Sequence, residues 1–126
     1  MSEQEIERKI QEKGLNAPRL TPDLIESVIV SEHYFTGKEG ELGSYKMNDD
    51  IRVGGAPTDK SNAALSCLTF CVLVLDNGFS VTGESACASP ENFDAEIGRE
   101  IARDNAKSKV WALEGYLLKQ KLHNQE

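Results

Sequence analysis

The strongest constraint on the fold comes from Asn77-Gly78, which separates an apolar segment from a more polar segment of similar length. Both residues accept a positive φ angle, so the pair favours a short turn between antiparallel strands. Leu68–Leu75 is almost wholly apolar and rich in β-forming residues, as in a strand covered on both faces. Phe79–Ala86 then becomes the return strand. The sequence therefore predicts a central β-hairpin against which other elements must pack.

A two-residue turn at Asn77-Gly78 would place Val74 opposite Val81 and Leu73 opposite Thr82. One face of the hairpin is then mainly apolar, and we expect it to meet the helices. Its members are Phe70, Val72, Val74, Phe79 and Val81. The other face mixes Leu73 and Leu75 with polar side chains, and we expect it to be free for an edge contact or a subunit interface.

Helices are predicted on both sides of this hairpin. Thr21-Pro22 is a cap followed by a proline suited to the first helical turn, and apolar residues at helical spacing extend the helix to about His33. Ser89-Pro90-Glu91 predicts a second start, for a helical segment that reaches about Leu122 and breaks or bends near Ser108. We expect an α+β fold: an N-terminal helix, a central antiparallel hairpin or small sheet, and C-terminal helices packed on it.

The chain length predicts a single domain over residues 1–126. Residues 1–20 are polar and charged, so we expect a flexible segment or a frayed helix. Residues 36–61 contain five glycines and few candidates for a core. Two interpretations stay open for this segment, a mobile loop and a lid or partner-binding arm.

Composition limits the classes of function. A net charge of −7 argues against a protein that binds bulk nucleic acid, because such proteins need many uncompensated cations. No apolar run is long enough for a membrane span, and the N-terminus has no apolar signal core, so we expect a cytoplasmic protein. Cys67, Cys71 and Cys87 are expected to be free thiols that pack inertly, with Cys87 on the opposite side of the sheet. No metal site, cofactor motif or nucleophile–base pair is recognisable.

Candidate binding residues lie on and near the helix predicted after residue 90. Arg99, Arg103 and Lys107 recur every four residues, beside a parallel row of carboxylates. This pattern fits a solvated face with weak internal ion pairs, and it also fits an anion site in which arginine grips a phosphate. Asn92 suits a cap or a base edge. Phe79 suits the core or a stacking platform for a nucleobase.

Several short segments carry a resemblance to a known family. They are Thr69–Leu75, Asn77-Gly78-Phe79, Gly83–Cys87, Asn92-Phe93-Asp94, Ile97-Gly98 and Trp111–Leu118. Together, over roughly Leu68 to Leu118, they resemble a family of small tailed-phage proteins that includes the first-described Thoeris anti-defence proteins. Those proteins are oligomers built from dimers, and they sequester cyclic ADP-ribose-type immune signals, in some cases also cyclic oligonucleotides.

The resemblance implies a non-enzymatic phage protein that forms a homo-oligomer and sequesters a small anionic nucleotide in the host cytoplasm. On that view Arg99 and Arg103 hold phosphate, Asn92 reads a base or ribose edge, and Phe79 stacks on the base. The alternative is a phage factor that binds and modulates a host protein through its acidic surface, with no small ligand.

Overall fold

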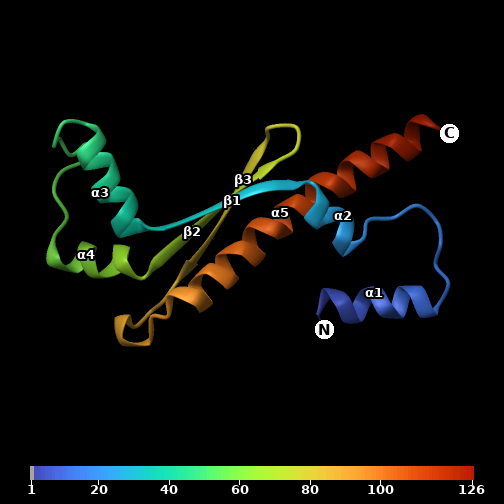
Figure 1. Ribbon diagram of the computed structural model, residues 1–126, viewed down its shortest axis with the longest axis horizontal. Helices are drawn as coiled ribbons and strands as arrows, with labels where there is room; N and C mark the ends of the chain where they lie inside the picture. Colours follow the sequence, from blue (N-terminus) through green and yellow to red (C-terminus); the bar gives the residue numbers. More distant parts are fainter. Residues whose placement is uncertain (1) are drawn as a thin grey trace.

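Three antiparallel strands form a sheet in the order β1-β2-β3 in this computed structural model, which describes residues 2–126. The strands are β1 (Ile29–Thr36), β2 (Leu68–Leu75) and β3 (Ser80–Ala86). The long helix α5 (Ala95–Asn124) runs along one face of this sheet (Figure 1). The predicted α+β class is therefore confirmed.

The hairpin is present, but its register differs from the predicted one. Gly78 N–H donates to the carbonyl of Leu75, and Leu75 N–H donates to that of Phe79, so the loop has three residues, Asp76 to Gly78. Of these three loop residues, only Gly78 takes a positive φ angle, +89°. Leu73 then pairs with Val81 instead of Thr82. A shift of one residue exchanges the two faces of a strand, so the prediction that the Phe70 and Val72 face meets the helix is wrong.

The core lies between the opposite face of the sheet and α5. Its buried residues are Ile25, Val28, Cys71, Leu73, Leu75, Val81, Ala102, Ala106 and Val110. Helix α5 presents small side chains to the sheet, which allows a very close approach. A Cβ atom on Gly83 would overlap the backbone of Ala102 and Ala106. Glycine at position 83 is thus required by the contact between β3 and α5.

The N-terminal region contains two helices, followed by a strand that was not predicted. Helix α1 spans Glu3–Glu12, and helix α2 spans Pro22–Ser27, with the Thr21 hydroxyl accepting from Leu24 N–H at 3.1 Å as predicted. The predicted extension of this helix to His33 is wrong. Residues 29–36 are mostly β-branched or aromatic, and they pair with β2 from Leu75 to Thr69.

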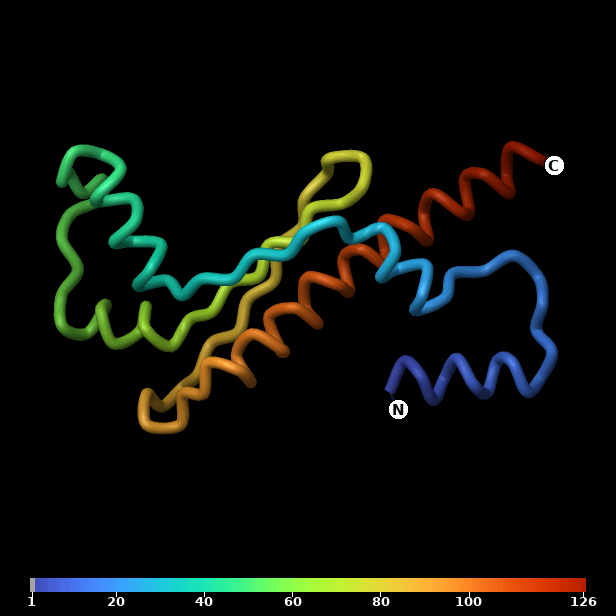
Figure 2. The backbone as a smooth tube through the Cα atoms, in the orientation of Figure 1, coloured from blue at the N-terminus to red at the C-terminus, as the bar shows by residue number. Residues whose placement is uncertain are grey.

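The expectation of a loop over residues 36–61 is also corrected. Helix α3 (Gly37–Met47) begins there, with Thr36 and Glu39 in a capping box, and helix α4 (Asp59–Ser66) follows with Thr58 as its N-cap. Only residues 48–58 connect them. The pair α3–α4 forms one end of an elongated molecule, and α1 lies toward the other end (Figure 2).

Helix α5 continues through Ser108 without the predicted break. It also begins later than predicted. Pro90–Asn92 forms a short 3-10 turn, η1, and Asp94 is the N-cap of α5, accepting from Ile97 N–H at 3.0 Å. Asp94 replaces Ser89 as the cap because Phe93, which follows the turn, has an extended backbone (φ −66°, ψ 128°) and so separates η1 from the helix.

Candidate functional site

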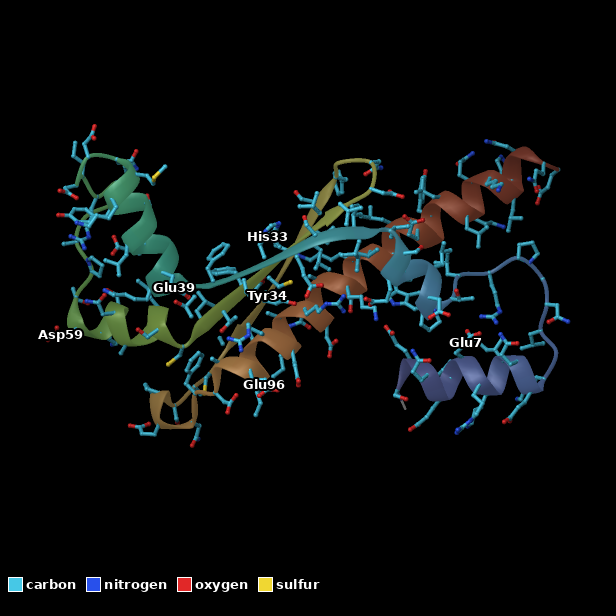
Figure 3. All side chains as sticks on the ribbon, in the orientation of Figure 1. Glu7, His33, Tyr34, Glu39, Asp59 and Glu96 are labelled. Atoms are coloured by element: carbon cyan, nitrogen blue, oxygen red, sulfur yellow. The ribbon has the colours of Figure 1, made fainter. Side chains whose placement is uncertain are left out.

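A pocket of about 280 Å³ lies where the first turns of α5 meet the ends of β1 and β2 and the start of α3. It combines one cation, three aromatic rings, three hydroxyls and one carboxylate. The lining residues are Tyr34, Phe35, Thr36, Glu39, Thr69, Phe93, Ala95 and Arg99. In Figure 3, Tyr34 lies on β1 and Glu39 at the start of α3. We call this the Arg99 pocket.

The side of the pocket formed by α5 carries the one cation of the lining, Arg99, near a helix N-terminus that the Asp94 carboxylate caps. Ala95 is the first residue of α5, so the positive end of the helix dipole faces this region. Arg99 stands one turn further and forms no ion pair with any residue from 2 to 126. A helix N-terminus beside an unengaged guanidinium is an arrangement suited to a phosphate or carboxylate.

Thr69 provides an unsatisfied polar group in the pocket wall. The residue is only 3% exposed, and its Oγ1 has no hydrogen-bond partner among residues 2–126. A buried hydroxyl without a partner costs free energy on the order of 1–3 kcal/mol, so such groups are uncommon in native proteins. The hydroxyl lies under α5, where a Cβ on Gly98 would come within 2.9 Å of it, so a ligand in the pocket could bond to it only after a local shift of this contact.

The opposite wall is aromatic and carries Glu39. Phe35 packs against Phe70 with ring centroids 5.6 Å apart, which fixes its orientation. Burial raises the pKa of Tyr34, and its hydroxyl donates to Glu32 Oε1 at 3.0 Å, so this ring stays neutral at physiological pH. Glu39 Oε1 accepts from Thr36 N–H at 2.9 Å and is held there as part of the helix cap.

The other two cations of the basic row on α5 form ion pairs with carboxylates from other elements. Arg103 donates to Glu26 at 2.7 Å and to Glu32 at 3.1 Å. Lys107 lies 2.8 Å from Glu26 and 2.7 Å from Glu3. The hydrogen bonds from Arg103 are the main reason that the pKa of Glu26 falls to about 2. This network ties α1, α2 and β1 to α5, and of the row only Arg99 lies outside it.

The four predicted ligand residues do not gather in one place within a protomer. Arg99 lines the pocket just described. Asn92 lines a smaller hollow beside Cys67 and Cys87. Phe79 is 56% exposed at the hairpin end, next to Leu113 and Tyr116. Leu113 is fourteen residues beyond Arg99 on α5, which corresponds to roughly 21 Å along the helix axis.

Four lining residues were missed because residues 22–33 were assigned to a helix and residues 36–61 to a loop: Tyr34, Phe35, Thr36 and Glu39. Thr69 was predicted to lie on the strand Leu68–Leu75, but no role in a site was assigned to it. Two local signals could have found the first four. Residues 28–36 have the composition of a strand, and Thr36-x-x-Glu39 is a capping-box pattern.

Within residues 2–126, no three His, Cys, Asp or Glu side chains gather as metal ligands would. The helices of this part of the chain also include none with the length and apolar character needed to cross a bilayer.

The family of the chain follows from comparison with known proteins. The model of the Phage protein (N4 Gp49/phage Sf6 gene 66) family matches residues 20–122, from just before α2 to the last turn of α5. No curated protein and no solved structure matches the chain. Because the match covers the sheet, the Arg99 pocket and nearly all of α5, the chain belongs to the Phage protein (N4 Gp49/phage Sf6 gene 66) family.

Proposed function

We propose that this phage protein binds a small anionic nucleotide in the Arg99 pocket and sequesters it, without cleaving it, in the cytoplasm of the host cell. The nucleotide class is a cyclic ADP-ribose-type signal or a cyclic oligonucleotide, as the resemblance over Leu68–Leu118 implies. The observation that carries the proposal is the unengaged Arg99 beside the α5 N-terminus and the unsatisfied hydroxyl of Thr69.

The chemistry of the pocket matches the parts of a nucleotide. Arg99 and the first turn of α5 would hold a phosphate, because the guanidinium offers a bidentate fork and the helix end adds positive potential. The rings of Phe35 and Phe93 offer faces for a base. The free oxygen of Glu39, and Thr69 Oγ1 after a local shift of its contact with α5, would bond to ribose hydroxyls or base amino groups. The volume of about 280 Å³ suits one nucleotide unit of a larger ligand.

Sequestration without turnover fits the polar groups that line the pocket. Cleavage would need a side chain that can act as a general base. The one carboxylate of the lining, Glu39, is engaged in capping α3, and the lining contains no histidine or lysine beside Arg99. Arg103 was expected to share the phosphate, but its donors are directed to Glu26 and Glu32. The proposal therefore assigns the phosphate contact to Arg99 and gives Arg103 a role in holding the fold.

Calorimetric titration with cyclic ADP-ribose isomers and cyclic oligonucleotides tests this proposal. We expect Arg99→Ala to weaken binding roughly ten- to a hundredfold, and Arg99→Lys to restore little of it, because lysine lacks the planar fork. Arg8→Ala is the matched control, since Arg8 is an exposed arginine of α1 and should leave the affinity unchanged. The nucleotide should be recovered intact after incubation.

Two results would contradict the proposal. Wild-type affinity in Arg99→Ala, with the fold verified by circular dichroism, would remove the Arg99 pocket as the site. No binding of the whole panel by the unaltered protein would instead favour the alternative, a factor that binds a host protein through its acidic surface.

A further inference from the structure

Cys67 and Cys87 are opposite each other across the β2–β3 ladder. The last strand pair is Leu68 with Ala86, and continuing that register by one residue pairs Cys67 with Cys87. A hydrogen bond confirms it, because Cys87 N–H donates to the Cys67 carbonyl at 3.1 Å. Directly opposed residues of this hydrogen-bonded kind have Cα atoms about 5.5 Å apart. That Cα separation lies within the range of disulfides, about 4.4–6.8 Å, whereas the Cβ atoms of such a pair are about 5.5 Å apart and must approach to about 3.5–4.5 Å for the bond to form.

Both side chains reach the same space. Cys67 and Cys87 line one hollow of about 140 Å³ together with Phe93 and Ile101. The expectation that Cys87 faces away from the other thiols is therefore wrong, for the same reason as the hairpin faces. Cys67 is 5% exposed, whereas Cys87 is half-buried and its thiol donates to the Ser89 carbonyl at 3.1 Å. An oxidant in solution can thus reach Cys87 first.

Cys71 has none of these features, which makes it an internal reference. It is fully buried, and the residue opposite it on β3 is Gly83, so no second thiol faces it. Burial raises the pKa of its thiol, which further lowers its reactivity. The expectation of an inert packing cysteine is kept for this residue.

We propose that Cys67 and Cys87 form a reversible cross-strand disulfide when the chain meets a low-molecular-weight disulfide such as oxidised glutathione. The Cys87 thiolate attacks one sulfur of the oxidant, which forms a mixed disulfide and releases one glutathione thiolate. The Cys67 thiolate then attacks the Cys87 sulfur and releases the second glutathione thiolate. Two protein thiols are oxidised and one glutathione disulfide is reduced, so two electrons pass to glutathione. The two thiol protons leave the protein.

The cross-link would join segments that border the Arg99 pocket. Cys67 is the C-cap of α4 and directly precedes β2, and Cys87 leads from β3 into η1 and α5. The hollow shares Phe93 with the Arg99 pocket, so the bond would fix the open end of the hairpin beside that ring. The proposal concerns the thiols alone and does not rest on the proposed function.

The test exposes the protein to a graded series of reduced and oxidised glutathione and measures intact mass and non-reducing peptide maps. We expect a product lighter by two hydrogen atoms, with the Cys67 and Cys87 peptides joined and Cys71 free, and its thermal midpoint should rise. Dithiothreitol should reverse both changes. Cys71→Ala should still form the bond, and neither Cys67→Ser nor Cys87→Ser should form it.

Three outcomes would overturn the proposal: all three thiols stay free at the most oxidising ratio, Cys87 retains glutathione although Cys67 is present, or the bond joins two chains. If Cys71→Ala fails to fold, the unaltered protein still decides, because its peptide map shows directly whether Cys71 takes part in the bond.

Discussion

At the scale of single residues, the fold depends on side chains that are small or absent. Helix α5 buries Gly98, Ala102, Ala106 and Val110 against the sheet, and Gly83 of β3 lies directly under this row. Larger side chains would hold the helix away from the strand. This role of Gly83 could not be predicted, because a glycine in a strand carries no local signal of what will pack on it.

The first prediction concerns Gly83. Gly83→Ala should destabilise the protein by at least about 2 kcal/mol, because the added Cβ would overlap the α5 backbone, which cannot move without disturbing the core. Gly43→Ala is the matched control. Gly43 lies in α3 with nothing near the position of a Cβ, so the same substitution should stabilise by about 0.5–1 kcal/mol. Chemical denaturation measures both changes, and equal stability of the two variants would contradict the close-packing argument.

The second prediction concerns Glu26, whose pKa falls from 4.5 to about 2, first because Arg103 donates hydrogen bonds to it. Since the folded-state pKa lies below the ordinary one, the stabilisation is present above about pH 4.5 and is lost as the pH falls from there toward 2. Glu26→Gln should therefore have a lower thermal midpoint than the wild type at pH 6, and the two curves should converge near pH 2.

The control for this titration is Glu100→Gln, an exposed carboxylate in the second turn of α5, beyond the first turn where the helix dipole acts most strongly. Its midpoint should follow that of the wild type across the whole pH range. A constant gap between Glu26→Gln and the wild type down to pH 2 would show that the loss comes from packing and that charge plays no part.

At the scale of elements, local patterns predicted the pieces whose signals are contained in the chain itself. The strand Leu68–Leu75, the turn containing Gly78 and the Thr21 cap all appear in the structure. The register does not follow from such signals, because it depends on how many turn residues take a positive φ, and only Gly78 does so. Strand β1 was missed for a different reason: the helix that starts at Thr21-Pro22 was extended to about His33, although residues 28–36 have the composition of a strand.

The same reasoning explains what could be predicted of the candidate site. Arg99 was recognisable as a cation on a helix, and it lines the Arg99 pocket. Thr69, Glu39 and Phe35 belong to three different elements, so their meeting depends on the β1–β2 pairing and on the position of α3. No local sequence pattern predicts that strand pairing.

The third prediction concerns α1, which has no buried residue and lies outside the family match. Polar contacts connect it to the rest of the protein, mainly Glu3 to Lys107 and Trp111, and Glu7 to Arg19. Deletion of residues 1–18 should remove the helical signal of about ten residues. It should lower the free energy of unfolding by only about 1 kcal/mol, because partly exposed ion pairs contribute little.

Circular dichroism and urea denaturation measure both effects of the deletion. Glu3→Gln in the full-length chain is the milder variant, and it should reproduce part of the stability loss while α1 remains helical. Loss of cooperative unfolding after the deletion would mean that α1 belongs to the core unit.

At the scale of the whole molecule, the protomer exposes more surface than its mass requires. Its accessible area is 8723 Å², whereas a compact monomer of this mass exposes about 6,700 Å². The difference, about 2,000 Å², exceeds the roughly 800 Å² that each partner buries in a typical stable interface. The elongated arrangement in Figure 2 accounts for the excess, since α3–α4 and the end of α5 extend away from the sheet. Such a shape leaves surface that an assembly can cover.

The fourth prediction is that the chain forms a homo-oligomer through the sheet face opposite α5. That face carries half-buried Phe70, Val72 and Val74 beside Phe35, which is 38% exposed, so a partner would remove apolar surface from water.

Light scattering at micromolar concentration should give a multiple of 13.9 kDa. Phe35→Glu should shift the mass toward 13.9 kDa, because a charge in that contact would lose its hydration. Met47→Glu, exposed at the end of α3, should leave the assembly intact. A monomeric mass for the unaltered protein would rule out self-association, and an unchanged oligomer in Phe35→Glu would place the interface elsewhere.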